Sequence, residues 1–89
     1  MDYEQIVHAL IDPIVENKNS IMIRELPAER ENDVLLLIVA DNADTARLIG
    51  HKGVTANALR EVINVAGKSE NKHIHLKFES FDEKGDDKI

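Results

Sequence analysis

LIGHKGVTANALR, residues 48–60, is the most informative stretch of this 89-residue chain. Two glycines three residues apart, Gly50 and Gly53, let the backbone turn sharply and let its N–H groups approach a ligand closely. The turn leads into a helix predicted over residues 54–66, whose first N–H groups attract anions. Lys52 adds a positive charge at the tip, and His51 adds a titratable polar group. These features predict a phosphate-binding turn.

The pattern Gly-x-x-Gly is short, so its surroundings determine what it indicates. It is not a P-loop, which has four residues between its glycines and a Lys-Ser/Thr pair after them. It is not a dinucleotide-binding fingerprint either, because that motif directly follows a strand. The structural alternative is a glycine-assisted turn between two helices.

The elements on either side of the turn are predicted from apolar patterning. Residues 41–49 read as a short helix that Asp41 or Asn42 caps. The seven apolar residues over 34–40 predict a strand that is central in a sheet or covered on both faces. Alternation over residues 73–79 predicts a second strand with one buried face. A helical crossover joins the two strands, so they are expected to be parallel, with Gly67 as a left-handed cap at the end of the second helix.

The N-terminal third adds one helix and one strand. Residues 3–16 carry an apolar stripe of helical spacing, in which Pro13 predicts a kink or an early end. A polar turn leads to a strand over 21–26, and the polar connection over 27–33 suits a hairpin loop. The predicted order is α-β-β-α-α-β. The fold class is therefore α+β, with a three-stranded mixed sheet and the helices on one face.

Composition limits the class of protein. The length suits a single domain, over residues 1–81, followed by a charged tail over 82–89 that we expect to be disordered. The chain contains no cysteine, which excludes disulfides and thiolate metal sites. No apolar run has the length of a membrane-spanning helix, and the first residues lack the pattern of a secretory signal, so a cytoplasmic protein without a membrane partner is expected. Aromatic residues make up 3% of the chain, too few for a base-stacking platform.

Charge is unevenly distributed along the chain. The formal net charge is −6, which argues against strong nonspecific binding to nucleic acid. Residues 44–77 nevertheless hold six basic and three acidic residues, so the segment that contains the turn is basic. Ordinary scatter of surface charge is the alternative.

On these residues the sequence resembles the KH domain, in its type II arrangement, and in particular the small stand-alone bacterial KhpA or YlqC-like proteins. In KH domains a Gly-x-x-Gly loop clamps the backbone of about four single-stranded nucleotides. The resemblance implies that Gly50, His51, Lys52 and Gly53 form this loop. It also implies that Ile49 and Val54 form an apolar bed for bases and that Arg60 is a basic contact two turns into the next helix.

The resemblance implies a non-enzymatic single-stranded RNA-binding protein that needs no cofactor, acting as an RNA chaperone or post-transcriptional regulator. Members of the family form homodimers or pair with a larger KH-containing protein linked to bacterial cell division and cell shape. The alternative function is a protein-interaction adaptor with a KH-like fold, one subunit of such a heterodimer.

Four other features of the sequence bear on function. His73 and His75 lie two residues apart on one face of a strand, a spacing that metal sites use. Two histidines on the solvent-exposed face of a strand are the simpler interpretation. Half of residues 34–40 would point to the open side of the sheet, where an apolar patch would mark a partner interface unless Met22, Leu26 or the tail covers it. The helix over 54–66, especially around Ala56, is the rival interface. The acidic cluster of Glu25, Glu29, Glu31 and Asp33 is interpreted as a solvated loop, and no catalytic group is indicated.

Overall fold

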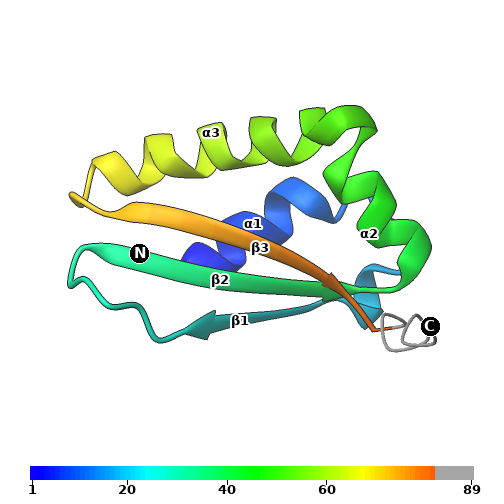
Figure 1. Ribbon diagram of the computed structural model, residues 1–89, viewed down its shortest axis with the longest axis horizontal. Coiled ribbons are helices and arrows are strands. Elements are labelled where there is room, and N and C mark those ends of the chain that lie inside the picture. Colours follow the sequence, from blue (N-terminus) through cyan, green and yellow to red (C-terminus); the bar gives the residue numbers. More distant parts are fainter. Residues whose placement is uncertain (82–89) are drawn as a thin grey trace.

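The computed structural model describes residues 1–81, so the predicted tail over 82–89 lies outside the described residues. Its elements follow the predicted order, with two short 3₁₀ turns added (Figure 1). They are α1 (Tyr3–Ile11), η1 (Lys18–Ser20), β1 (Met22–Leu26), β2 (Asp33–Ala40), α2 (Asn42–Ile49), η2 (His51–Gly53), α3 (Val54–Lys68) and β3 (His73–Ser80). The α-β-β-α-α-β order is therefore confirmed.

The three strands form one sheet with β2 at its centre. β1 pairs with β2 in the antiparallel direction, as expected for strands joined by a short connection. β3 pairs with β2 in the parallel direction, and α2 and α3 form the crossover between them. The sheet is therefore mixed, as predicted. Leu37 pairs with Arg24 on one side and Lys77 on the other, which fixes the register of all three strands.

Alternate residues of β2 anchor the hydrophobic core. Figure 1 shows α1 behind the sheet and α3 running beside β3. The core-facing side chains of β2 are all buried, with Leu36 and Ile38 at most 1% exposed. The helices and β3 contribute the rest of this cluster: Tyr3, Val7, Ile11, Leu48, Leu59, Ile63, Ile74 and Leu76. Burial of a large apolar side chain contributes about 1.5–3 kcal/mol, so this one cluster holds the layers together.

α1 ends earlier than its apolar stripe. The stripe continues to Val15, but the helix ends at Ile11. Pro13 has no N–H to donate to the carbonyl of Ala9, so the α-helical ladder cannot continue through it. A turn follows, in which the N–H groups of Ile14 and Val15 both donate to the carbonyl of Ile11. The early end at Pro13 is thus confirmed.

Gly67 has a different role from the one predicted. The prediction that it ends the helix in a left-handed conformation is wrong, because α3 continues to Lys68 and Gly67 is a buried helical residue. A Cβ at Gly67 would lie 2.7 Å from the carbonyl oxygen of Lys72 and 2.9 Å from Cγ1 of Ile74. The left-handed residue in the turn is Asn71, with φ 59°. The glycine is required by the close approach of α3 to the start of β3.

The other face of the sheet carries an apolar row. Leu35, Leu37 and Val39 alternate with the core residues of β2 and are only half-buried. Leu26 and Met22 lie beside Leu35 and Val39 in the register and cover them in part, with Met22 itself 39% exposed. The apolar open face is therefore present as expected, and its use as a partner interface stays a prediction.

α3 presents a second apolar surface. It buries the side that faces the sheet, including Leu59 and Ile63. Ala56 lies on this buried side and is 2% exposed, so the prediction of an interface around Ala56 is wrong. Ala58, Val62 and Val65 lie on the solvent side, and the two valines are 50% and 71% exposed. We call these three residues the α3 stripe. Among residues 1–81, no helix has the length and apolar character needed to cross a membrane.

Candidate nucleic-acid interface

The loop of residues 50–53 reverses the chain between α2 and α3 (Figure 1). Three of its four residues have positive φ: Gly50 at 77°, Lys52 at 57° and Gly53 at 79°. A left-handed conformation costs a non-glycine residue roughly 1–2 kcal/mol, so Lys52 is strained. Such strain concentrates in loops that bind ligands. The turn therefore holds an exposed lysine at its tip in an unfavourable conformation.

The two glycines are needed for different reasons. Gly50 has φ 77° and ψ 172°, a region that essentially only glycine occupies. A Cβ on Gly50 would also collide with Thr55, because it would lie 2.8 Å from the Thr55 Cβ and 2.9 Å from its backbone nitrogen. Gly53 has a left-handed conformation with open space around it, since a Cβ there would have no atom within 4 Å. Gly50 is thus required by packing as well as by backbone conformation.

α3 begins without a side-chain cap. Asp2 caps α1 by accepting from the N–H of Gln5, and Asp41 caps α2 by accepting from the N–H of Asp44. The N-cap of α3 is Gly53, which has no side chain to accept a hydrogen bond. The first N–H groups of a helix lack partners within the helix and carry partial positive charge. The N–H of Val54, the first residue of α3, already donates to the carbonyl of His51. An anion can take the place of the missing cap at the N–H groups that follow it.

The predicted contact side chains around the turn are accessible. His51 and Lys52 are exposed at its tip. Ile49 precedes it and is 38% exposed, and Val54 follows it and is 65% exposed. The structure thus places cationic and apolar side chains together within six consecutive residues. This combination suits a nucleotide, which has a charged phosphate and a base with an apolar face.

Arg60 lies apart from the turn and is held in place. It is six residues beyond Val54, about 9 Å along the helix axis. Its Nη2 donates to the carbonyl of Leu76 on β3, and its Nη1 donates to Oδ1 of Asn57, both at 3.2 Å. The guanidinium carbon lies 5.6 Å from the centroid of the Phe78 ring, within the range of a cation–π contact. Arg60 therefore belongs to the seam between α3 and β3.

Asn64, which the sequence analysis missed, closes part of the free edge of β3. Its Nδ2 donates to the carbonyl of Ile74 at 2.9 Å, and its Oδ1 accepts from the N–H of Ile74 at 2.8 Å. The asparagine thus pairs with the strand as a neighbouring strand would. A lone asparagine in a helical pattern gives no signal of this role, because its partner is known only once β3 is packed against α3.

A second missed residue, Asp44, is the fully buried charged group of the described chain. Its carboxylate accepts from the backbone N–H groups of Glu16 at 2.9 Å and Asn17 at 3.0 Å. Nη1 of Arg47 completes the set with an ion pair of 2.6 Å. The Glu16 N–H, followed by the Asn17 N–H and Arg47, lowers the pKa of Asp44 and outweighs the opposing effect of burial. Asp44 therefore ties the segment after α1 to the helix that leads into the turn.

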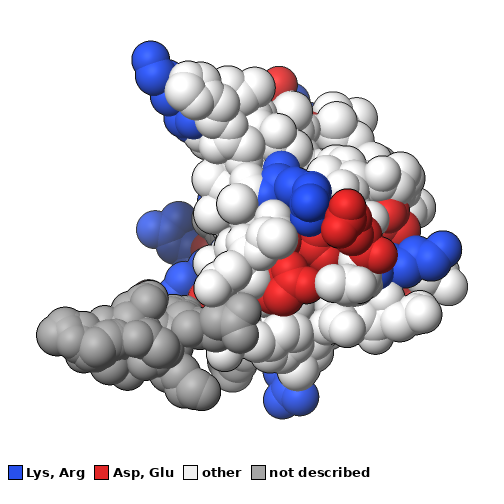
Figure 2. Space-filling view, turned by 90° about the vertical axis from the view of Figure 1, so that its right-hand side faces the viewer, with Lys and Arg blue, Asp and Glu red and all other residues white. Residues whose placement is uncertain are grey.

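Figure 2 shows the end of the molecule where α2 and the turn lie. Acidic side chains gather near the centre of this face, with basic side chains around them. Arg47 forms ion pairs with Asp44 and Glu16, the latter at 3.6 Å. Within residues 1–81, Lys52 takes part in no ion pair. The positive charge of Lys52 is therefore available to a bound anion.

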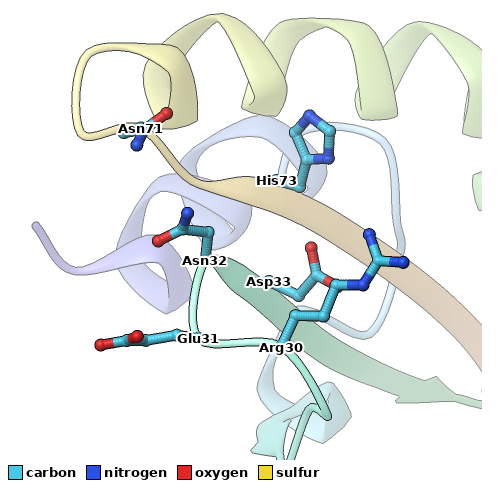
Figure 3. Close-up of a pocket in the computed structure, with 6 residues that line it drawn as sticks. All are labelled: Arg30, Glu31, Asn32, Asp33, Asn71 and His73. Carbon is cyan, nitrogen blue, oxygen red and sulfur yellow. The ribbon is translucent and has the colours of Figure 1, made fainter.

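A hollow of about 330 Å³ lies at the far end of the domain (Figure 3). Its lining is polar and comes from the β1–β2 connection and the start of β3: Arg30, Glu31, Asn32, Asp33, Asn71 and His73. None of the predicted contact residues lines it. α3 has 15 residues, about 22 Å of helix, and separates this end from the turn. In the described part of the chain, no group of three or more His, Asp and Glu side chains is placed to hold a metal ion.

The sheet order, the helical crossover and the Gly-x-x-Gly turn define a KH domain of type II. The family model described as "KhpA/KhpB, KH domain" matches residues 4–78, and the chain belongs to this family. The RNA-binding protein KhpA of Bacillus subtilis (strain 168) is 31% identical over 79 residues, which cover 89% of this chain and 93% of that protein. The RNA-binding protein KhpA of Aquifex aeolicus (strain VF5) is 29% identical over 73 residues, covering 82% and 90%. No solved structure matches the chain significantly.

Substitution of the two glycines should separate their roles. Gly53→Ala places a side chain in a left-handed conformation with open space, so we expect a loss of about 1–2 kcal/mol in the free energy of unfolding. Gly50→Ala adds a collision with Thr55, so we expect about 3 kcal/mol or more. Urea unfolding followed by circular dichroism measures both. Equal losses for the two variants would contradict the packing role of Gly50.

The lowered pKa of Asp44 predicts how stability depends on pH. Its contribution is fully present above the ordinary aspartate pKa of about 3.9, and it is lost as pH falls through the lower folded-state value. Asp44→Asn should therefore be less stable than the parent at pH 7, and the difference should shrink as pH falls from about 5 to about 2. Urea unfolding at several pH values measures this. Glu29→Gln, in the exposed β1–β2 connection, is the control; a constant difference for Asp44→Asn would refute the prediction.

Proposed function

We propose that this chain binds single-stranded RNA through the turn of residues 50–53 and catalyses no reaction. The observation that carries the proposal is the uncapped start of α3 beside the exposed side chain of Lys52. The relatives from Bacillus subtilis and Aquifex aeolicus are both described as RNA-binding proteins, and this chain matches 93% and 90% of their lengths. The anion-binding features of the turn and the similarity to RNA-binding relatives therefore favour the same ligand.

The proposed mechanism is a backbone clamp. N–H groups at the start of α3 and the ammonium group of Lys52 hold phosphate oxygens. Ile49 and Val54 provide apolar surface for the bases that follow. A domain of this kind grips about four nucleotides, so its affinity and sequence preference are modest. The net charge of −6 weakens binding elsewhere on the surface and confines RNA to the turn.

An RNA-binding module of this size suits the role of an RNA chaperone or post-transcriptional regulator in the cytoplasm. We propose that role here, with the link to bacterial cell division and cell shape that the family resemblance implies. The second candidate function is a protein-interaction adaptor. Two apolar surfaces of the described fold favour it: the half-buried open face of the sheet and the exposed α3 stripe.

We further propose that the chain self-associates through the α3 stripe. Its valines are more exposed than the leucines of the sheet's open face. The open face carries charged side chains of both signs, Arg24, Lys77 and Glu79, so packing two copies face to face would remove them from water. A dimer would carry two turns and raise the affinity for one RNA strand through effective concentration. The same stripe would serve pairing with a larger KH-containing protein.

Charge reversal at the tip of the turn tests the clamp. Lys52→Asp should weaken the binding of a labelled single-stranded RNA several-fold or more and reduce the salt dependence of binding by about 0.7 in log–log slope, the contribution of one phosphate contact. Fluorescence anisotropy across a salt series measures both. Circular dichroism checks that the variant is folded.

The matched control is Lys77→Asp, which makes the same charge change on the open face of the sheet. It should alter binding far less, because only the overall charge changes. Equal weakening by both variants would mean that RNA senses net charge and not the turn. A folded parent without RNA binding would leave the adaptor as the better account.

The proposed dimer is tested by light scattering at several protein concentrations. The parent should approach twice the mass of the 10.0 kDa chain as concentration rises. Val62→Glu, in the α3 stripe, should remain monomeric because it would bury a charge in the interface. Leu37→Glu, on the open face of the sheet, should still dimerise. The reverse pattern would place the interface on the sheet, and a monomeric parent would refute self-association.

A further inference from the structure

The polar hollow at the start of β2 and β3 has no part in the proposed clamp. It lies at the opposite end of α3 from the turn, and none of the side chains that tie α3 to the edge of β3 lines it. Its volume of about 330 Å³ is at the lower end of the range for small-molecule sites. The hollow is therefore large enough for a small planar ring system and is separate from the proposed RNA interface.

Two hydrogen bonds join the walls of the hollow across the sheet. The N–H of His73, on β3, donates to the carbonyl of Asn32 in the β1–β2 connection at 2.8 Å. Nζ of Lys72 donates to the carbonyl of Glu31 in the same connection at 3.4 Å. The backbone that frames the hollow is thus held in place without a ligand, which lowers the entropy that binding would cost.

Asp33 is the positioned carboxylate of the hollow. Its side chain is 23% exposed, and its Oδ1 lies 3.6 Å from Nε2 of His75. Figure 3 shows Asp33 pointing from the β1–β2 connection toward β3, whereas Glu31 points away from the strand. Within residues 1–81, no donor is hydrogen-bonded to Oδ2 of Asp33. The carboxylate can therefore accept hydrogen bonds from a ligand.

Donor groups line the hollow together with this carboxylate. Arg30 contributes a guanidinium, Asn32 and Asn71 contribute side-chain amides, and His73 contributes an imidazole. In the described part of the chain, Arg30 takes part in no ion pair. The ring of His73 is exposed, and a histidine ring can stack on a base. The hollow thus combines one positioned acceptor, several donors and a surface for stacking.

We propose that this hollow is a second binding site, which takes a guanine base. Guanine presents two adjacent donors on one edge, N1–H and the N2 amino group, and the two oxygens of a carboxylate can accept from both. Its O6, next to N1, accepts from an amide or guanidinium donor. Adenine, cytosine and uracil each place an acceptor beside the donor of that edge, which a carboxylate repels. The inference does not depend on RNA binding at the turn.

A nucleotide titration followed by amide NMR of the ¹⁵N-labelled protein tests the site. The ligands are the monophosphates of guanosine, adenosine, cytidine and uridine, which carry the same phosphate, so that differences report on the base. The guanosine nucleotide should shift the amide of His73 and bind at least roughly fivefold more tightly than the other three. Equal affinities, or shifts confined to residues 51–55, would overturn the proposal whether or not any variant folds.

Asp33→Asn tests the role of the carboxylate. The new amide can accept from N1–H and donate to the O2 that replaces the amino group in xanthine. The variant should therefore lose the preference for guanosine monophosphate and favour xanthosine monophosphate, a gain that a merely structural role of Asp33 would not produce. Glu29→Gln, which removes the same charge outside the hollow, should bind like the parent. A preference for guanosine that survives in Asp33→Asn would refute the assignment.

The base could come from a free nucleotide or from an RNA strand held at the turn, and three decanucleotides distinguish these sources. One contains only uridine, and the others carry one guanosine at the 5′ or the 3′ end. Tighter binding of a guanosine-ended strand, lost in Asp33→Asn, assigns the hollow to bound RNA. Equal binding of the three strands, with the nucleotide preference intact, assigns it to free guanine nucleotides. The nucleotide preference without any RNA binding would support this inference and refute the proposed clamp.

Discussion

The parallel pairing of β2 with β3 is the constraint on which this domain depends. A chain that leaves the end of one strand must return to the start of its parallel neighbour before it can pair. Here α2 follows β2, and α3 returns the chain to the start of β3. The parallel pairing therefore depends on a tight reversal between the two helices. Gly50 permits that reversal, because its backbone conformation and the space beside Thr55 both exclude a side chain. The turn that completes the fold is therefore also the turn that leaves a helix start uncapped.

Local sequence patterns predicted the helices, the strands and the turn. The roles of Asp44, Asn64 and Gly67 depend on tertiary contacts and were not predicted. The turn glycines, the alternation in β3 and the stop at Pro13 all act over a few residues, so the sequence predicted them correctly. Asp44 and Asn64 were missed because their partners lie 28 and 10 residues away and are paired only after packing. The role of Gly67 was predicted wrongly for the same reason. The atoms that leave no room for a side chain there belong to the turn before β3 and to β3 itself.

Charge and position together explain how an acidic chain can present an anion site. The carboxylate of Asp44 is satisfied internally, by backbone N–H groups and by Arg47, so it fastens α2 without facing the turn as a free charge. Lys52 stays outside these pairs. Tyr3 supports the opposite end of α3, where its hydroxyl donates to Glu70 at 2.5 Å and this contact raises the pKa of Tyr3 to about 12. α2 and the far end of α3 are thus both anchored to the N-terminal part of the chain.

The most direct test of RNA binding at the turn is an amide NMR titration of the ¹⁵N-labelled protein with an unlabelled single-stranded hexanucleotide. It reports on every backbone N–H at once, including the groups that would hold phosphate. Binding at the turn should give the largest shifts at residues 51–55, continuing along α3 to the Phe78 amide on β3, while Leu35 and Leu37 stay unchanged. Shifts confined to the open face of the sheet, or no shifts at RNA concentrations well above that of the protein, would contradict it.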